Sequence, residues 1–457
     1  MEQARPLPAG PLFPQPEKNE PARSFQYRRC RFLEGPVEGI FMNLQKLLAA
    51  RVHGMKPSPI RKLVPIMRTP GMISLGGGYP NARTFAFKSV DVVFKSGRSF
   101  SIRDQAVDLA CQYGPTDASA DLKSQILRWH AAKDGVTLKG EQIQVLNGAQ
   151  EGLHTMAYLF LDREDSVILC EPAYPGALGA FRAFTEHFIP VPLDAQGMIT
   201  TELETILEKR RAAGKKLPKF IYDVPNGNNP AGVSLSLERR RHLMQIASRH
   251  DLLILEDDPY QMVQLEENDP LPTLQSLDCE ERVVRLDSFS KIFAPGLRLG
   301  YASGPPQVIG YFQLYKQGTN LHTSAMDQAL LSGFLANHTY EEFRALIREN
   351  CGIYRKNRDA VLAAARKYLP SDIRYNVPPA GMFIWFEMPT GFDAERMVET
   401  DGMELGILLV PGIGFSTTGG LKNYMRASFS MINPEQVEES MIRFAKMIER
   451  ERNRTSK

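Results

Sequence analysis

The sequence has little of several features that mark specialised classes of protein. It holds five cysteines among 457 residues, and no run of apolar residues is long enough to span a bilayer. No two of the cysteines have the spacing of a zinc or redox motif; they are Cys30, Cys111, Cys170, Cys279 and Cys351. This pattern argues against a disulfide-rich secreted scaffold and a membrane-spanning helix, and it favours a reducing compartment.

An excess of charge of one sign is also missing. The chain has 55 basic and 52 acidic residues, which gives a net charge of +3. This near balance gives no electrostatic reason to expect nucleic acid or an anionic membrane as a partner. Hydrophobic residues make up 43% of the chain, which is typical of globular proteins, and the length allows two or three domains.

The first residues of the chain lack apolar positions with a regular period. Residues 1–38 are rich in proline, and we expect them to form a flexible tail. They have no signal-peptide apolar core, and acidic residues such as Glu17 and Glu20 are unlike a transit peptide, so we expect a cytoplasmic protein. Apolar residues from Phe41 to Val52 then recur at helical spacing and predict a helix.

Five short apolar runs are each followed by a polar or glycine-rich loop, and amphipathic stretches lie between them. Such alternation predicts an α/β fold with a mostly parallel central sheet that is covered by helices on both faces. In these sheets, ligands bind at the carboxyl ends of the strands, so we expect the five loops to converge on one site. The runs are residues 143–146, 167–169, 219–222, 252–255 and 283–286.

The rest of the chain suggests a division into further parts. We expect residues 39–95 to contribute to a small domain and the substrate site, 96–330 to form the large domain, and 331–457 to form a smaller α+β domain. The elements expected towards the C-terminus are a long helical stretch, two strands and a terminal helix, at 325–370, 381–386, 406–410 and near 434–450.

The most informative stretch is Asp287-Ser288-Phe289-Ser290-Lys291, which is followed by Arg298. It places one lysine in a loop after an apolar run, among hydroxyl groups and ahead of an arginine. A lysine held among phosphate ligands is typical of one that forms an imine with pyridoxal 5'-phosphate (PLP). In isolation, the same residue would be interpreted as a surface lysine after a turn.

PLP chemistry also needs an acid beside the pyridine nitrogen and donors for the ring hydroxyl. Asp257 is the last residue of a strand that is predicted to be buried. A carboxylate there needs a strong partner to stay charged, and a protonated pyridine nitrogen would be one. The alternative is a turn or helix N-cap aspartate, a role that suits Asp258 better. Tyr260 and Asn229 can donate to the ring hydroxyl oxygen, although Asn229 also lies in a turn-forming stretch.

A phosphate cradle is predicted where residues 148–150 join a strand to a helix. Exposed backbone amides and the helix dipole favour an anion there, although a glycine at a strand-helix turn is weak evidence alone. Ser288, Ser290 and Arg298 add hydroxyl and guanidinium donors.

Two further residues are candidates for contacts with the ring and the substrate. Tyr174 can stack on the ring, although a tyrosine of the core is equally common. Arg426 is a charged residue inside an apolar, strand-like run, where it needs an anion. A substrate α-carboxylate fits bidentately, and an internal salt bridge is the alternative.

These motifs resemble those of a known family, the fold-type I PLP-dependent aminotransferases of class I/II. Within it the chain looks most like the branch of 2-aminoadipate, kynurenine and aromatic amino acid aminotransferases, from about Pro57 to about Lys446. The motifs are PSPIR (57–61), SLGGGYPN (74–81), EPAYPG (171–176), VPNGNNPAG (224–232), EDDPY (256–260), DSFSKIFAPGLRLGY (287–301), PPAGMF (378–383) and YMRASFS (424–430).

The resemblance implies catalytic roles for three of the residues. Lys291 corresponds to the lysine that binds PLP and shuttles the proton, and Asp257 to the partner of the pyridine nitrogen. Tyr260 corresponds, with Asn229, to a ligand of the ring hydroxyl, and Tyr174 to the stacking aromatic.

Further roles implied by the resemblance concern the phosphate and the substrate. Tyr113 corresponds to a phosphate ligand that is supplied by the other subunit of a homodimer. Arg426 corresponds to the α-carboxylate clamp, and Arg61, Gly78 and Asn229 to substrate-side residues. Phosphate-ligand positions are occupied by Ala149, Gln150, Ser288, Ser290 and Arg298.

The reaction that the resemblance implies is transamination from an amino acid to a 2-oxo acid, with 2-oxoglutarate as the expected acceptor in a ping-pong cycle. Other PLP chemistry on the same scaffold remains an alternative: a carbon-sulfur lyase, a decarboxylase or an oxidase. A non-enzymatic PLP-sensing module is less favoured, because the tail is too short for a DNA-binding domain. Two positions depart from the family: Ala149 replaces a serine or threonine beside the phosphate, and Ala231 replaces a threonine.

Overall fold

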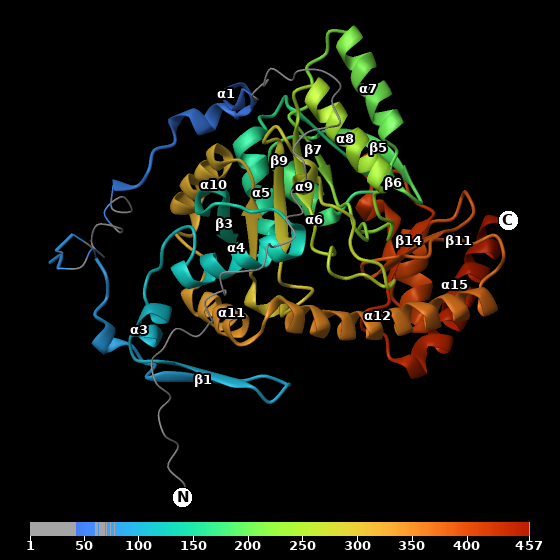
Figure 1. Cartoon of the computed structure of the whole chain (residues 1–457). Helices are drawn as coiled ribbons and strands as arrows, with labels where there is room; N and C mark the ends of the chain where they lie inside the picture. Colours follow the sequence, from blue (N-terminus) through green and yellow to red (C-terminus); the bar gives the residue numbers. More distant parts are fainter. Residues whose placement is uncertain are drawn as a thin grey trace, which may run out of the picture. The chain divides into compact units, whose positions relative to one another are not determined.

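The computed structural model describes residues 43–59, 63, 69, 71–73, 75, 76 and 78–456 (Figure 1). The expected tail and Arg61 lie outside these residues, so the predictions made for them are not addressed. None of the helices in the described residues is both long and apolar enough to cross a membrane.

A sheet of eight strands forms the centre of the fold, in the order β3-β10-β9-β8-β7-β4-β5-β6. Parallel pairing joins β9, β8, β7, β4 and β5, whereas β10 is antiparallel to both β3 and β9. Because β10 reverses direction between its neighbours, β3 runs the same way as β9. The strands are β3 (Ile143–Leu146), β4 (Ser166–Glu171), β5 (His187–Asp194), β6 (Gly197–Met198), β7 (Phe220–Asp223), β8 (Leu253–Asp257), β9 (Val283–Ser288) and β10 (Gly300–Ser303).

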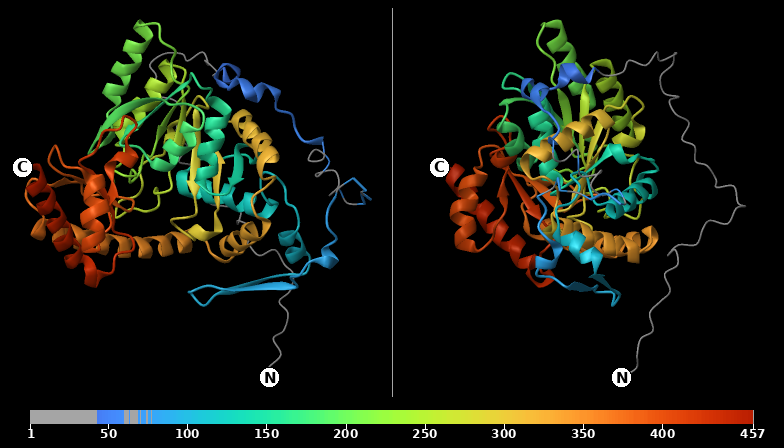
Figure 2. Two further views of the ribbon diagram at one scale, coloured as in Figure 1. Left: turned by 180° about the vertical axis from the view of Figure 1, so that it is seen from behind. Right: turned by 90° about the vertical axis from the view of Figure 1, so that its left-hand side faces the viewer.

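Helices cover both faces of this sheet (Figures 1 and 2). Neighbouring residues of a strand point to opposite faces. On β7, Phe220 packs in one core with Leu153 of α5, and Ile221 packs in another core with Leu243 of α8. The expected fold class, mostly parallel and covered on both sides, is therefore confirmed. The helices are α4 (Ala120–Asp134), α5 (Ala149–Phe160), α6 (Pro175–Arg182), α7 (Thr200–Ala212), α8 (Leu237–Arg249), α9 (Leu274–Leu277) and α10 (Pro306–Thr319).

A second, antiparallel sheet of four strands follows later in the chain, in the order β11-β12-β14-β13. Its strands are β11 (Arg374–Tyr375), β12 (Phe383–Glu387), β13 (Val410–Pro411) and β14 (Tyr424–Ser428). The expected strand at 406–410 is wrong for most of its length. Gly406 adopts φ +68° after a helix, and Ile407 donates its amide to Gly402, so the ladder begins only at Val410.

The long helix α12 (Tyr340–Tyr368) connects the cores of the two sheets. Phe343 and Ile347, in its first half, belong to the core of the large sheet, whereas Val361 and Leu362 belong to the core of the small one. The expected helical stretch at 325–370 and the terminal helix are confirmed. The helices of this part are α11 (Ala325–Asn337), α12, α13 (Ala394–Arg396), a π-helix (Met397–Gly402), α14 (Met403–Leu405) and α15 (Val437–Thr455).

The predicted helix from Phe41 to Val52 is broken in the structure. Its described part forms α1 (Leu44–Leu47) and a 3-10 helix at Ala50–Gly54. The break has a tertiary cause, because the amides of Ala49 and Ala50 donate to Leu159 and Asp162 instead of continuing a helix. The other elements are β1 (Ser89–Val93), β2 (Ser99–Arg103), α3 (Gln105–Cys111) and 3-10 turns at Ala82–Thr84, Gly140–Gln142, Pro295–Leu297, Gly412–Phe415 and Pro434–Gln436. The proposed division at residues 95 and 330 stays a prediction.

Candidate active site

The five predicted loops follow five strands that run in one direction, so they lie at one edge of the large sheet. Asp257 is the last residue of β8, and Ser288 is the last residue of β9. Gly148 precedes α5, Tyr174 precedes α6, and Asn229 follows β7.

Asp257 is a buried acid with one free oxygen. Its side chain is 4% exposed, and its Oδ2 accepts a hydrogen bond from the hydroxyl of Tyr222 at 3.0 Å. Within the described part of the chain, its Oδ1 has no hydrogen-bond partner. Burial raises the pKa of Asp257 to about 7, although the Tyr222 hydroxyl lowers it. A buried carboxylate with an unused oxygen is suited to a cationic or N–H partner.

Lys291 lies in the loop after β9 and is only partly exposed. Burial lowers the pKa of its ammonium group, and the positive charges of Arg298 and Arg426 lower it further. No carboxylate pairs with Lys291 in the described residues. This environment favours the neutral amine, which is the form that acts as a nucleophile or base.

A cradle of donors lies at the start of α5. A Cβ on Gly148 would lie 2.4 Å from Arg298 Nη2, so only glycine lets the guanidinium approach the backbone. Arg298 itself adopts φ +51°, and its Nη1 donates to the hydroxyl of Ser290 at 3.4 Å. The Ser288 hydroxyl accepts a hydrogen bond from the amide of Ser290 at 3.2 Å. The structure thus brings the predicted anion ligands together at a helix N-terminus.

Other predicted phosphate ligands occupy the first turn of α5. Ala149 is the first residue of the helix, and a Cβ on Gly300 would lie 3.2 Å from its amide nitrogen. Gln150 follows, and its side chain donates to the carbonyl oxygen of Gly176 at 2.7 Å, which ties α5 to α6.

Arg426, on β14, faces the large sheet without an ion pair in the described residues. Its Nη1 donates to Asn229 Oδ1 at 2.8 Å, and its Nε has no hydrogen-bond partner. The guanidinium lies 4.3 Å from the ring centroid of Phe383 and 5.1 Å from that of Phe415. The described residues thus offer no internal salt bridge to Arg426, and its free donors suit an anion.

Two tyrosines stand near these groups. The ring of Tyr174 lies over Gly176, where a Cβ would come within 2.5 Å of the ring. Burial raises the pKa of Tyr174, and the charge of Asp257 raises it further. Tyr260 is buried, contacts Phe383 edge to face, and its pKa is raised by burial and by Asp257. Neither hydroxyl is therefore ionised near neutral pH.

Tyr113 and Gly78 lie apart from these contacts. Tyr113 is 45% exposed and lies near the rings of Tyr79 and His322. Gly78 is exposed, and a Cβ there would meet no atom of the described residues within 4 Å. The structure of one chain thus does not bring Tyr113 or Gly78 to Lys291.

Asp258 directly precedes a turn at residues 259–262, but its side chain takes part in ion pairing rather than in a cap. Its Oδ2 accepts from Arg285 at 3.1 Å and from Asn226 at 2.8 Å. Asp258 and Asp257 are neighbours on an extended segment and so point to opposite faces. Asp258 therefore belongs to a buried ion cluster behind the predicted site.

Comparisons with known proteins decide the family. The model of the family "Aminotransferase class I and II" matches residues 88–444. The mitochondrial kynurenine/alpha-aminoadipate aminotransferase of Mus musculus is 34% identical over 422 residues, which cover 89% of this chain and 99% of the mouse protein. The chain belongs to the class I and II aminotransferases.

Two further proteins resemble this aminotransferase. Aromatic-amino-acid aminotransferase 1 of Thermococcus litoralis is 30% identical over 419 residues, covering 92% of this chain and 98% of the relative. The crystal structure of the kynurenine aminotransferase of Pyrococcus horikoshii, solved in complex with PMP, is similar with a TM-score of 0.72 and 32% identity. That match covers 90% of this chain and 98% of the other.

The cofactor of this aminotransferase is pyridoxal 5'-phosphate, and the site fits it. The orphaned Oδ1 of buried Asp257 suits the N–H of a protonated pyridine ring. The donors around Gly148 and Arg298 suit a phosphate, and the amine of Lys291 suits an aldehyde.

Inspection of the sequence missed Tyr222 and the aromatic pair around Arg426. Tyr222 ends an otherwise apolar run, and a buried tyrosine hydroxyl needs a partner. That requirement is a signal that could have pointed to Asp257. Phe383 and Phe415 gave no comparable signal, because a phenylalanine in a strand or turn is ordinary core material.

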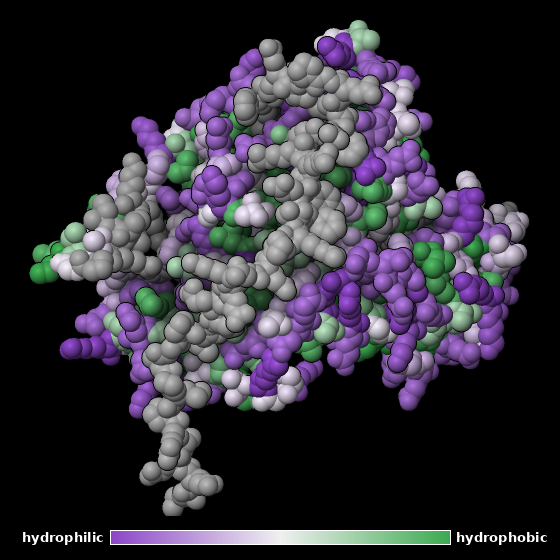
Figure 3. Space-filling view, viewed as in Figure 1, coloured by the Kyte–Doolittle hydropathy of each residue, from purple (hydrophilic) through white to green (hydrophobic). Residues whose placement is uncertain are grey.

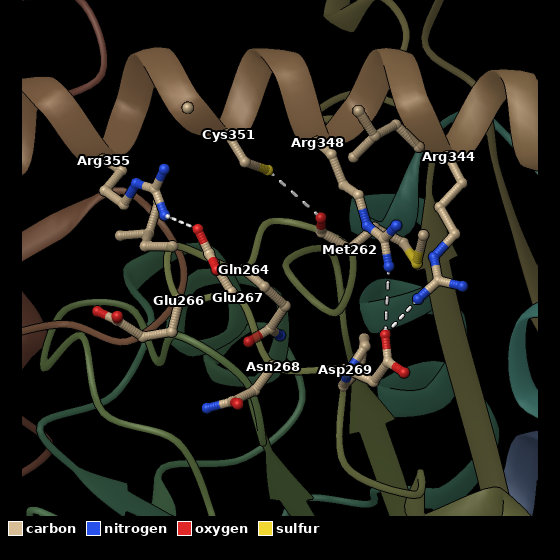
Figure 4. A pocket seen from close by; sticks show the side chains of 14 residues that line it. Met262, Gln264, Glu266, Glu267, Asn268, Asp269, Arg344, Arg348, Cys351 and Arg355 are labelled. Carbon is tan, nitrogen blue, oxygen red and sulfur yellow. Dashed lines mark hydrogen bonds and ion pairs between the residues drawn. The ribbon is translucent and has the colours of Figure 1, made fainter.

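A separate pocket of the aminotransferase is shown in Figure 4. It is lined by residues 262 and 264–270 and one face of α12, and none of the predicted site residues lines it. Arg344 pairs there with Asp269, and Arg355 with Glu267 at 3.4 Å. Both carboxylates are largely exposed, and ion pairs of this kind contribute about 0–1 kcal/mol each.

Proposed function

We propose that this aminotransferase transfers the amino group of an aromatic or 2-aminoadipate-like amino acid to a 2-oxo acid, with 2-oxoglutarate as the acceptor. The names of the mouse and Thermococcus relatives support this substrate class. The observation that carries the proposal is the gathering of three groups that are incompletely partnered in the described residues. They are the free oxygen of Asp257 and the amine of Lys291 at the edge of the large sheet, and the donors of Arg426 on β14, whose charge lowers the pKa of Lys291.

Lys291 is proposed to hold the cofactor and to move the proton. When bound, PLP supplies an aldehyde carbon for the substrate amine and a ring that withdraws electrons. The lowered pKa of Lys291 increases the share of neutral amine, the form that can take a proton from the substrate Cα and deliver it to a neighbouring atom.

Asp257 is proposed to keep the ring nitrogen protonated, and Tyr260 and Asn229 to hydrogen-bond the ring hydroxyl. Tyr174 is proposed to stack on the ring. Asp257 ends β8, and the other residues that would hold the ring lie in the loops after β4, β7 and β8. Because these residues come from strand ends of one rigid sheet, they can hold the ring without moving themselves.

The phosphate is proposed to bind at the start of α5. There the amides of Ala149 and Gln150 and the side chains of Ser288, Ser290 and Arg298 would supply hydrogen-bond donors.

Arg426 is proposed to bind the substrate α-carboxylate. Asn229 fixes one of its nitrogens, and the rings of Phe383 and Phe415 restrict its plane. An arginine held in this way loses little rotational entropy when it binds a carboxylate bidentately. Arg61 and Gly78 stay proposed substrate-side residues.

A homodimer with shared sites is part of the proposal. Tyr113 is exposed in its own chain and lies beside the ring of His322, which suits a ligand given to a second copy. Met72, Ile73 and Leu75 are 48%, 92% and 99% exposed. Hydrophobic atoms also stand out at the left-hand edge of the space-filling view, where the blue segment of Figure 1 lies (Figure 3). Contiguous exposed apolar side chains are typical of interaction surfaces. Sedimentation analysis of the holoenzyme tests the dimer.

A cytoplasmic location is also a proposal. The cysteines in the described residues are all free, which fits a reducing compartment. The name of the mouse relative assigns that protein to mitochondria, so fractionation of cells that express the full chain is the deciding test.

A panel of amino donors tests the proposed reaction. Holoenzyme is mixed with one amino acid at a time, first without and then with 2-oxoglutarate. We expect kynurenine, 2-aminoadipate or an aromatic amino acid to change the cofactor spectrum alone, and the oxo acid to restore it. Initial rates should give parallel double-reciprocal lines, as a ping-pong cycle requires. Release of CO₂, sulfide or hydrogen peroxide without a spectrum that an oxo acid restores would contradict transamination.

A further inference from the structure

Tyr222 is a buried residue to which the reaction as proposed assigns no role. It lies on β7, and its side chain is 2% exposed. Its hydroxyl donates to Asp257 Oδ2 at 3.0 Å, which is the one hydrogen bond to this carboxylate in the described residues. The bond therefore joins the acid of the site to the neighbouring strand.

The geometry of the sheet explains how Tyr222 reaches the acid. In the parallel register of β7 and β8, Tyr222 lies opposite Leu255. Asp257 is two residues further on and therefore on the same face, about 6–7 Å along the strand. A tyrosine ring spans this offset and places its hydroxyl beside the carboxylate, whereas a serine or threonine would be too short.

The ring of Tyr222 is itself held in place. It contacts the ring of Phe181 nearly edge to face, with the centroids 5.4 Å apart and the planes at 84°. Phe181 belongs to α6, which begins directly after Tyr174. The helix that follows the proposed stacking residue thus also fixes the direction of the Tyr222 hydroxyl.

We propose that Tyr222 is a positioning residue for the cofactor: its hydroxyl occupies one oxygen of Asp257, so that the other oxygen is presented to the ring nitrogen. A tyrosine hydroxyl that merely needed an acceptor could use a backbone carbonyl group, whereas a buried carboxylate needs donors to remain ionised. With one oxygen held by Tyr222, the carboxylate cannot rotate freely. The sheet, rather than the ligand, then fixes the direction of the second oxygen.

The same bond favours the charged form of the acid. Burial raises the pKa of Asp257, and removal of the Tyr222 hydroxyl would raise it further. A neutral acid cannot pair with a protonated ring nitrogen, so the proton on the ring would be held less tightly. The groups that act on the carboxylate, or that its charge acts on, come from several elements: Tyr222 of β7, Asp258, Tyr260 and Tyr174 of the loops, and Arg285 and Asp287 of β9.

The inference rests on the proposed role of Asp257, and a double-mutant cycle separates the two. Wild type, Tyr222→Phe, Asp257→Asn and the double variant are each loaded with PLP, and the dissociation constant and the pH dependence of the visible spectrum are measured. We expect Tyr222→Phe to bind PLP about 10-fold more weakly, as loss of a hydrogen bond to a charged group predicts. The spectral transition that reports the ring proton should move to lower pH. In the Asp257→Asn background, Tyr222→Phe should add little.

A cofactor analogue makes the test specific for the ring nitrogen. PLP in which carbon replaces that nitrogen should bind equally well to wild type and Tyr222→Phe. As a matched control, Tyr301→Phe removes another buried hydroxyl, which lies 3.0 Å from His130 Nδ1, and should leave PLP affinity within about twofold.

Three results would overturn the proposal. They are unchanged affinity and spectrum in Tyr222→Phe, an equal loss with the carbon analogue, and full additivity in the double variant. If Asp257→Asn also bound PLP normally, the proposed role of Asp257 itself would fail. If Tyr222→Phe alone left the PLP affinity and the spectrum unchanged, the role of Asp257 would stand. Only the inference about Tyr222 would then fail.

Discussion

Two groups of charged side chains flank the ends of β8 and β9, on opposite faces of the sheet. On the back face, Arg285 lies 3.0 Å from Glu256, 3.1 Å from Asp258 and 2.9 Å from Asp287. Lys133 of α4 lies 2.9 Å from the same Asp287. Every one of these charges has an opposite charge in contact, so the cluster is closed in terms of charge pairing, although Oδ1 of Asp258 has no hydrogen-bond partner in the described residues.

The front face is built in the opposite way. In the described residues, Asp257 keeps an oxygen without a partner and Arg426 keeps an unbonded Nε. The charges that act on Lys291 there are the positive ones of Arg298 and Arg426. Unsatisfied buried polar groups are costly, and they persist where a ligand completes them. The comparison teaches that burial of charge alone does not mark the active site, whereas a group of neighbouring charges without opposite charges in contact does.

The largest difference between the faces is expected from their two lysines. Lys291→Ala should lower turnover at least about 1000-fold, because it removes both the cofactor link and the proton carrier. Lys133→Met should instead lower the free energy of unfolding by about 3–5 kcal/mol, as breaking a buried pair does, while folded molecules keep bound cofactor. Turnover per bound PLP and urea unfolding measure the two effects. Equal losses of turnover in the two variants would remove the distinction.

Arg426 and its free donors give the next effect in size. Arg426→Lys should lower kcat/KM for amino acids about 10- to 100-fold, because one charge-assisted hydrogen bond of a bidentate pair is lost. The loss should be smaller for the matching amine that has no carboxylate. Steady-state kinetics with both substrates measure this, and an equal loss for acid and amine would argue against a carboxylate clamp.

Asp257 and Asp223 should respond to pH with the opposite sign from Asp287. Burial raises the pKa of Asp257 to about 7 and that of Asp223 to about 6, so the folded state binds these protons more tightly than the unfolded state. Their contribution to stability is full below about pH 4 and is lost as pH rises through the folded values. Arg285 and Lys133 lower the pKa of Asp287 against the opposing effect of burial, so its contribution is instead lost as pH falls below about 4.

Urea unfolding of the cofactor-free protein between pH 5 and 8 measures the first of these effects. Asp257→Asn should reduce the slope of the free energy of unfolding against pH by up to about 1.4 kcal/mol per pH unit. Asp223→Asn should reduce this slope in the lower part of the same pH range. A wild-type stability that rises steadily from pH 5 to 8, unaltered in both variants, would show that neither acid holds its proton in the folded state.

Much of this arrangement could be predicted from the sequence, because it depends on local patterns. The apolar run 143–146 matches β3 residue for residue, and Asp257 was placed correctly at the end of a buried strand. The rest depends on partners that are distant in sequence. The side chain of Asp258 joins an ion cluster because it contacts Arg285, and Tyr222 reaches Asp257 only because β7 and β8 are paired. Side-chain pairs across strands leave no periodic signal in one sequence.

The smallest effect is expected at Ala149, where the family has a hydroxyl. Its amide is at the start of α5, close to Gly148 and Arg298. Ala149→Ser should tighten PLP binding about fivefold, which corresponds to one added hydrogen bond. Titration of the cofactor-free protein measures the dissociation constant. Weaker binding in this variant would indicate that the phosphate does not lie beside residue 149.

The central claim is that the incompletely partnered groups of the front face, and not the closed cluster behind them, hold the cofactor. Treating the holoenzyme with borohydride, digesting it and sequencing the cofactor-bearing peptide by mass spectrometry tests this claim most directly. We predict a single modified residue, Lys291, in the peptide that contains Ser288 and Ser290. Modification of Lys133, of any other lysine, or of none would contradict the account.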